Sequence, residues 1–191
     1  MERRDLLKMI VAATGAAMVG LPALVNGQVP AAGAKSIFSA ADVGTLDEIA
    51  DTILPRTTTP GAKDAGAGAF MARFVTDCYT AQQQAAFRTG LADIDKRAGG
   101  RFVSLTPQAR TELLRVLDAE ARKHAVEVSE TGTAEAAKAM PHYFTMIKQL
   151  AIFGFFTSKV GATEVLQYVA VPGRYDGDLA YVPGTPAWGT S

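Results

Sequence analysis

The stretch that decides the fold runs from Ser39 to Leu54 and reads SAADVGTLDEIADTIL. Ser39 and Asp42 stand three residues apart in the capping-box pattern that begins a helix. The apolar residues that follow recur at helical spacing over four turns, at Val43, Leu46, Ala50, Ile53 and Leu54. Pro55 disfavours helical backbone in the residue before it. The stretch therefore predicts an amphipathic helix that ends before Pro55.

The same helical period continues through most of the chain. Further helical segments are expected around Phe70–Cys78, from Thr80 to Gly99, from Thr106 to His124, and from about Ala134 or Pro141 to Phe156. Between the first two helices, residues 57–68 form a loop, and Ser158 to Tyr168 gives a turn and a short helix. No segment longer than four residues alternates with the period of a strand, with the exception of the region from Tyr168 to Val171. These patterns predict an all-α fold, a small irregular helical bundle with a long extended C-terminal tail.

The segment that ends at Phe156 is expected to be the central core helix. Its buried stripe is predicted to hold Tyr143, Phe144, Ile147, Leu150 and Ala151, widened by Phe153, Phe155 and Phe156. His142 precedes this helix, where a protonated imidazole would oppose the helix dipole, so we expect it to be neutral or exposed. His124 is expected to be a hydrogen-bonded element of a helix surface.

The chain divides into four segments by composition. Of its 191 residues, 48% are apolar and 20% are charged, which is enough to bury the core of one domain. The expected boundaries are an export signal at 1–27, a linker at 28–38, a helical domain at 39–169 and an extended tail rich in proline, glycine and aromatic residues at 170–191.

The first 27 residues have the layout of an export signal. The signal residues are Arg3, Arg4, Leu6, Leu7 and Lys8, which resemble the twin-arginine pattern. A mildly apolar run follows, with cleavage expected after Gly27 or near Ala32–Ala34. An uncleaved membrane anchor is the alternative. The leader predicts a periplasmic protein exported by the twin-arginine pathway.

The composition argues against several functions. Nineteen basic and nineteen acidic residues cancel, so the chain lacks the basic excess typical of nucleic-acid binding. One cysteine and two histidines leave little to build a metal site from. The sequence contains no dinucleotide fingerprint, haem-attachment motif or zinc-protease motif. We therefore expect no catalytic residue, cofactor or metal in this chain, and we expect no enzyme activity from it alone.

Three interpretations remain open at this point. Cys78 is either a small buried apolar residue or one half of an interchain disulfide. The tail from Pro172 onwards either straps its own helices or lies along another protein. An enzyme that uses His142, or Asp51 with Glu48, is a further alternative, although nothing in the sequence supplies a convergent partner group.

Four segments, in order, resemble motifs of the gluconate 2-dehydrogenase subunit 3 family. The first is LDEIADTILPRTTTPGAKDAG at Leu46–Gly66, and FRTGL follows at Phe87–Leu91. The third is FGFFTSKVG at Phe153–Gly161, in which Phe155 stands where the family usually has tyrosine, and the fourth is PGRYDG at Pro172–Gly177. The likeness covers the chain from about Phe38 to Trp188.

The resemblance implies a small, cofactor-free subunit of a periplasmic oxidoreductase. Its partner would be an FAD-dependent enzyme of the glucose–methanol–choline type that acts on a sugar, a glycoside or gluconate, and a c-type cytochrome with haem c often takes the electrons. The expected role is to escort and stabilise that flavoprotein. The candidate interface residues are Pro60, Gly61, Arg174, Tyr175, Tyr181 and Trp188. The alternative is a free-standing periplasmic helical protein that binds a small molecule or acts as a chaperone.

Overall fold

The described part of the chain is helical throughout its folded body. The computed structural model describes residues 36–130, 139–171, 173, 177–180 and 182–189. Five α-helices follow one another, with a short 3-10 turn, η1, at Phe102–Ser104 and a π-helical turn, η3, at Gly161–Val165. The α-helices are α3 (Ala40–Ile53), α4 (Ala67–Cys78), α5 (Ala81–Arg97), α6 (Pro107–Glu130) and α7 (Tyr143–Phe156). The described residues include no strand, so the all-α prediction is confirmed.

The sequence signals for helix ends are found where they were expected. Ser39 accepts a hydrogen bond from the Asp42 amide and returns one to its carboxylate, and Thr80 and Gln83 do the same at α5. Each such cap satisfies amide groups that would otherwise lack a partner in the first turn. At the end of α5, Gly99 takes a positive φ of 70°, a conformation that glycine adopts without strain.

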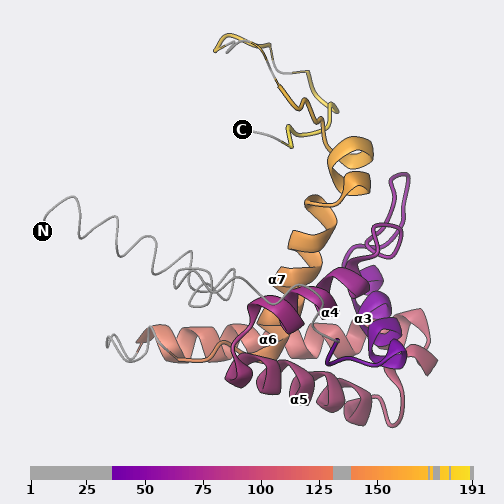
Figure 1. Cartoon of the computed structure of the whole chain (residues 1–191), viewed down its shortest axis with the longest axis vertical. Helices are drawn as coiled ribbons and strands as arrows, with labels where there is room; N and C mark the ends of the chain where they lie inside the picture. Colours follow the sequence, from indigo (N-terminus) through magenta and orange to yellow (C-terminus); the bar gives the residue numbers. More distant parts are fainter. Residues whose placement is uncertain (1–35, 131–138, 172, 174–176, 181, 190–191) are drawn as a thin grey trace, which may run out of the picture.

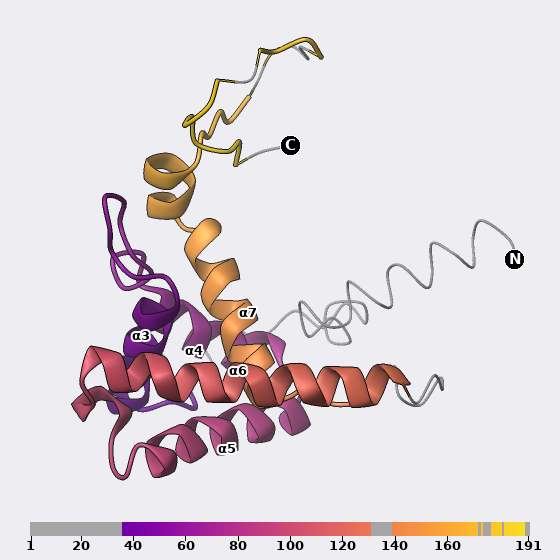
Figure 2. The ribbon, with the colours of Figure 1, turned by 180° about the vertical axis from the view of Figure 1, so that it is seen from behind.

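Helix α7 is the centre of the bundle, as predicted. Figures 1 and 2 show α5 and α6 running side by side, with α7 crossing them and rising away from the body. α7 contacts each of α3, α4, α5 and α6. Its buried face carries Phe144, Met146, Ile147, Leu150, Ala151 and Phe155. Ion pairs from Arg97 to Glu120 and from Lys148 to Asp118 join α5 and α7 to α6.

The end of α7 departs from the prediction. Phe155 is buried at 4% exposure, but Phe153 is 39% exposed and Phe156 is 37% exposed. The expectation that all three widen the buried stripe was wrong for Phe153 and Phe156. The physical reason is visible in Figure 1, where the last turns of α7 extend beyond the helices that cover its first half. On these turns α4 covers the Phe153 ring only in part, through Phe70 and Phe74, so more than a third of the residue stays exposed.

Helix α4 also buries a narrower stripe than expected. Its buried residues are Ala67, Gly68, Met71, Ala72 and Val75, whereas Phe70, Phe74 and Cys78 are only half-buried. The three half-buried residues flank the buried line. Phe70 and Phe74 stack against each other and against Phe153 of α7, with ring centroids 5.6–6.0 Å apart.

The described tail lies beyond the C-terminal end of α7, away from α5 and α6 (Figures 1 and 2). Two backbone hydrogen bonds join the end of the tail to its beginning. The Gln167 amide donates to the Ala187 carbonyl at 2.8 Å, and the Gly189 amide donates to the Gln167 carbonyl at 2.7 Å. Residues 168–171, 177–180 and 182–189 are exposed. The predicted export signal, residues 28–35 of the predicted linker and the Ala134 helix start lie outside the described residues. Residues 36–38 are described, and Phe38 is buried in the core against Phe87, so the linker prediction was wrong for Phe38. Within the described ranges, no helix has the length and apolar character needed to cross a bilayer.

Candidate functional site

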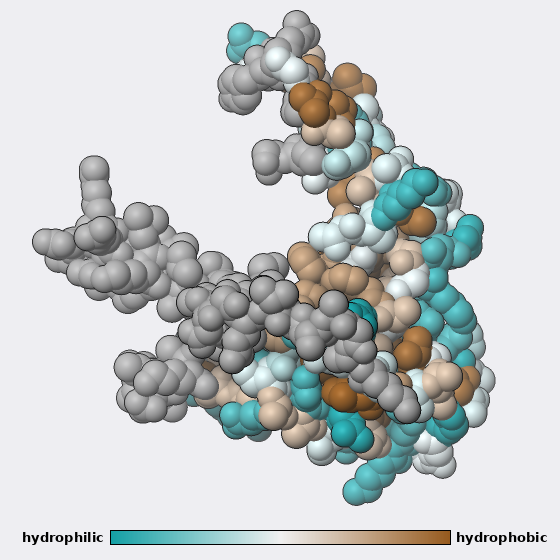
Figure 3. Space-filling view, in the orientation of Figure 1, coloured by the Kyte–Doolittle hydropathy of each residue, from teal (hydrophilic) through white to brown (hydrophobic). Residues whose placement is uncertain are grey.

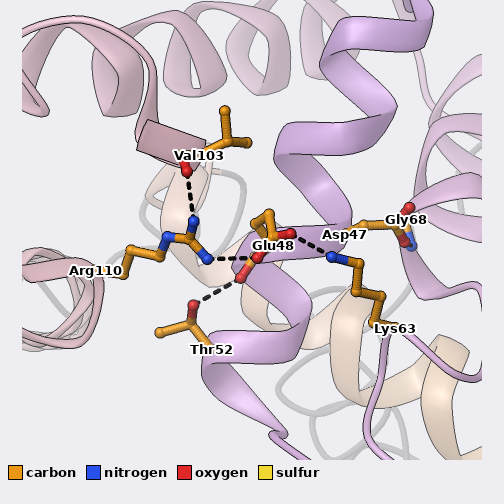
Figure 4. Close-up of polar contacts among 7 residues, drawn as sticks. All are labelled: Asp47, Glu48, Thr52, Lys63, Gly68, Val103 and Arg110. Carbon is orange, nitrogen blue, oxygen red and sulfur yellow. Dashed lines mark hydrogen bonds and ion pairs between the residues drawn. The ribbon is translucent and has the colours of Figure 1, made fainter. Parts of the chain in front are cut away.

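The long motif at 46–66 forms the second half of α3 and the loop that leads to α4. Figure 4 shows Glu48 of α3 between two cations. One carboxylate oxygen pairs with the Lys63 ammonium in the loop, and the other pairs with the Arg110 guanidinium of α6 at 2.5 Å. Glu48 and Arg110 stand 62 residues apart in the sequence. Glu48 therefore ties the motif loop and α6 to α3.

The environment of Glu48 keeps it charged. Its pKa is lowered, first by the hydrogen bond from Lys63 and then by the charges of Lys63 and Arg110, which outweigh partial burial. Arg110 is fixed in turn, because it donates to the Val103 carbonyl at 2.5 Å and lies 5.8 Å from the centroid of the Phe102 ring. A carboxylate with both oxygens in ion pairs holds helices together; it is poorly placed to take a proton from a substrate.

Asp47 holds the beginning of α4. Its carboxylate accepts a hydrogen bond from the Gly68 amide at 2.8 Å, which pins the start of α4 against α3. A Cβ atom at Gly68 would lie 2.6 Å from the Asp47 backbone nitrogen, so the close approach requires glycine. The acidic side chain at this helix start repels phosphate. Gly66–Ala67–Gly68 therefore does not fit a dinucleotide.

The Pro60–Gly61 turn is built into the same loop. The Gly61 amide donates to the Asp64 carboxylate at 2.8 Å, and Asp64 also pairs with Arg56, so its pKa is lowered by Arg56 first and by the Gly61 amide second. Gly61 is buried, Pro60 is half-buried, and residues 55–59 are exposed. Most of the accessible surface of this candidate interface therefore lies just before Pro60.

The two histidines meet where α6 faces the start of α7. His142 is the N-cap of α7, and its Nδ1 accepts from the Phe144 amide at 3.2 Å. Its ring stacks on Tyr143 at 4.4 Å and lies 6.1 Å from the ring of His124. Burial, followed by the positive potential of His124, lowers the pKa of His142. Both the lowered pKa and the cap, which needs a lone pair on Nδ1, favour the neutral form of the expected neutral or exposed His142.

Cys78 and an open surface hollow are two further candidate sites, and they lie on different elements. Cys78 is a half-buried free thiol at the end of α4, and burial raises its pKa, so it stays protonated at neutral pH. An open hollow of about 480 Å³ lies between the start of α3 and α5, lined by the charged residues Asp42, Arg88 and Asp95 among others. The described residues contain no cluster of three or more His, Cys, Asp or Glu that could hold a metal ion.

The tail candidates are only partly described. Trp188 is 52% exposed and pairs through its backbone with Gln167. Arg174, Tyr175 and Tyr181 lie outside the described residues, as do the signal residues Arg3, Arg4, Leu6, Leu7 and Lys8. The interface role of the tail stays a prediction.

The structure exposes a surface that sequence reasoning missed. Ile152, Phe153 and Phe156 share one face of α7 and are 36–39% exposed. One feature of the sequence could have revealed this surface. Gln149 and Thr145 lie on the same face of α7, one and two turns before Ile152, and polar residues there indicate that this face points to solvent. Figure 3 shows apolar side chains along α7 and on the described tail.

Comparison with known proteins gives one match. The model of the family described as gluconate 2-dehydrogenase subunit 3 matches residues 40–173, from the first residue of α3 to the start of the tail. No curated protein matches, and no solved structure matches.

Proposed function

The chain belongs to the gluconate 2-dehydrogenase subunit 3 family, and from this premise we propose that it is the non-catalytic small subunit of a periplasmic, FAD-dependent sugar, glycoside or gluconate dehydrogenase. The family match carries the proposal, because it covers the whole described helical bundle and places the chain among subunits of a dehydrogenase complex. FAD would be held by a catalytic partner of the glucose–methanol–choline type, and a c-type cytochrome would be a third member.

The chemistry of the described residues supports this division of labour. The Gly68 amide at the start of α4 is held by the Asp47 carboxylate, Glu48 is held by two cations, and His142 caps a helix. The motif residues Asp47 and Glu48 thus stabilise the bundle through their side chains. The substrate-oxidising chemistry would belong to the partner.

We further propose that this subunit carries the export signal for the complex. Arg3 and Arg4 begin a sequence that resembles a twin-arginine signal, which directs proteins that have already folded. Such a route suits a flavoprotein that must bind FAD in the cytoplasm. The partner would then reach the periplasm bound to this chain.

Co-expression with a candidate flavoprotein subunit tests the proposal. With this chain present, flavoprotein activity is expected in the periplasmic fraction; the double substitution Arg3→Lys with Arg4→Lys should leave both proteins in the cytoplasm. Arg88→Lys with Arg115→Lys is the matched control, because it makes the same chemical change within the helical bundle. Export of active flavoprotein without this chain would refute the escort role. Flavin bound to this chain alone would refute the non-catalytic role.

A free-standing periplasmic binding or chaperone protein is the alternative from another class. It would purify from its native source as a monomer with no flavin-containing companion. Size-exclusion chromatography with absorbance at the flavin wavelength distinguishes the two.

A further inference from the structure

Exposed apolar side chains are concentrated at one end of the molecule. Of the eleven large apolar side chains exposed among the described residues, nine lie between Ile152 and Trp188, and the other two are Val116 and Val126 on α6. We call the described residues from Ile152 to Gly189 (152–171, 173, 177–180 and 182–189) the C-terminal arm. Its exposed members are Ile152, Phe153, Phe156, Tyr168, Val169, Val171, Leu179, Val182 and Trp188.

We propose that the C-terminal arm, including the outer face of α7, is the surface that docks the flavoprotein subunit. This inference rests on the proposed function and identifies the contact surface that it requires. It also goes beyond the sequence-based candidates, which placed no interface residue on α7.

The area of the arm matches what a stable complex needs. Added together, the exposed fractions of the nine residues equal about four and a half fully exposed residues. At about 200 Å² for each, the exposed surface is roughly 900 Å². A stable protein–protein interface buries about 800 Å² on each partner. Exposed apolar surface on this scale is uncommon on a protein that works alone and marks an interaction site.

The arm carries few charged residues, as the core of a protein–protein interface does. Its described charged residues are only Lys159, Glu164 and Asp178. Interface cores are depleted in charge and enriched in aromatic side chains, and the arm has four exposed aromatic rings, at Phe153, Phe156, Tyr168 and Trp188. The surface is therefore suited to a large apolar patch on a partner.

The described helices leave most of the arm's apolar side chains exposed. The outer turns of α7 and the tail lie beyond α5 and α6 in both views (Figures 1 and 2). The rings of Phe70 and Phe74 of α4 pack against one side of the Phe153 ring. These contacts hold the Phe153 ring in place, while 39% of the residue stays exposed. A ring held in place loses little conformational entropy when a partner covers it.

The occupant is a different subunit, because the chain belongs to a family of dehydrogenase subunits. The match runs through residue 173 and so includes the exposed turns of α7 and the part of the arm nearest the bundle. A second copy of this chain would instead give a homodimer, which the experiment below detects.

The test compares two double valine substitutions in the full chain, co-expressed with an affinity-tagged flavoprotein. Val171→Ser with Val182→Ser changes the arm, where the residues are 81% and 57% exposed. Val116→Ser with Val126→Ser makes the same chemical change on α6, where they are 45% and 54% exposed. The arm variant should lower retention of this chain on the flavoprotein by about tenfold, because it removes apolar surface that the partner would bury, and the control should change it less than about twofold.

A second variant tests the helical part of the arm. Ile152→Ser with Phe156→Ser should lower retention to a similar degree, with circular dichroism showing that the helices still melt cooperatively. If Ile152→Ser with Phe156→Ser destabilises α7, the valine variants still test the inference, because Val171 and Val182 lie outside every described helix.

Each outcome has a defined meaning. If the wild-type chain binds the flavoprotein and the arm variants bind equally well, the docking inference fails while the proposed function stands. If the wild-type chain does not bind the flavoprotein, the proposed function fails and the inference fails with it. If the arm variants abolish a homodimer seen by light scattering and leave flavoprotein retention unchanged, the arm is a self-association surface and the inference is overturned.

Discussion

At the scale of single residues, the polar side chains of the family motifs act through their neighbours in the bundle. Glu48 joins three elements through Lys63 and Arg110, and Asp47 fixes the start of α4 through the Gly68 amide. In the sequence, Glu48 and Asp51 stand three residues apart on a helix. That spacing does not distinguish a solvated helix face, a pair of catalytic carboxylates and an ion-pair centre. Only the position of Arg110 on α6 shows that Glu48 is an ion-pair centre.

His142 is expected to make the stability of the bundle depend on pH. Its pKa is lowered from the usual 6.5, so the unfolded chain takes up a proton more readily than the folded chain. The stability that this group contributes is complete above pH 6.5 and is lost as the pH falls below it. Glu120 and Asp93 oppose the shift, while His124 and Arg97 reinforce it.

The substitution His142→Asn isolates this effect, because asparagine caps helices without titrating. Between pH 7.5 and 5, urea unfolding should show the wild type losing up to about 1 kcal/mol relative to the variant, the usual contribution of an N-cap. Above pH 7 the two proteins should differ little in their pH dependence. Parallel profiles over the whole range would show that His142 does not contribute to the pH dependence.

At the scale of elements, the helices approach one another most closely at glycines. The contact of α3 with α4 depends on Gly68, and the contact of α5 with α7 depends on Gly90, where a Cβ atom would lie 2.3 Å from the Tyr143 ring. Tyr143 donates a hydrogen bond to Asp93 of α5 at 2.6 Å, which keeps the ring in that position. The contact at Gly90 explains why a glycine occurs within the motif at Phe87–Leu91.

Gly68→Ala should therefore destabilise the bundle, although alanine favours helix. Its Cβ would collide with the Asp47 backbone, and overpacking of this kind costs about 1–3 kcal/mol. Gly44→Ala on α3 is the matched control, because nothing lies within 4 Å of its Cβ position. The control should gain up to about 1 kcal/mol from helix propensity. Chemical denaturation measures both, and equal effects would show that the α3–α4 contact is loose.

At the scale of the whole molecule, a helical body carries a projecting arm. The body has a continuous core formed by α3 to α7, whereas the described residues of the tail are exposed and hydrogen-bond mainly to one another. The two parts therefore have different physical tasks: the body folds by burying apolar surface, and the arm keeps apolar surface available.

A chain that ends at Val171 should fold as stably as the full chain. The described residues beyond Val171 contribute none of the buried core, so the free energy of unfolding should change by less than about 0.5 kcal/mol. A chain that ends at Ile152 is the control, because it also removes the buried Phe155 and should be strongly destabilised. Thermal melting followed by circular dichroism distinguishes the cases, and loss of cooperative melting in the first chain would show that the tail is part of the fold.

The sequence by itself determined the helices, their caps and the family. Ser39 with Asp42, Thr80 with Gln83, and the Thr106 hydroxyl, which accepts from the Ala109 amide at 3.3 Å, act within one turn of the chain, so local pattern is enough to place them. The apolar period likewise identified α7 as the central helix. These features depend on contacts between residues close in sequence.

Only the tertiary structure decided which apolar side chains stay exposed and which charges meet. Phe153, Phe155 and Phe156 look alike in the sequence, but Phe155 is buried while Phe153 and Phe156 are more than a third exposed. The reason is that α5 and α6 lie against the other end of α7 and do not reach its last turns. In the same way, Glu48 meets Arg110 only because α6 passes beside α3. Exposure and ion pairing depend on where distant segments begin, cross and end, and a local pattern contains no information about those distances.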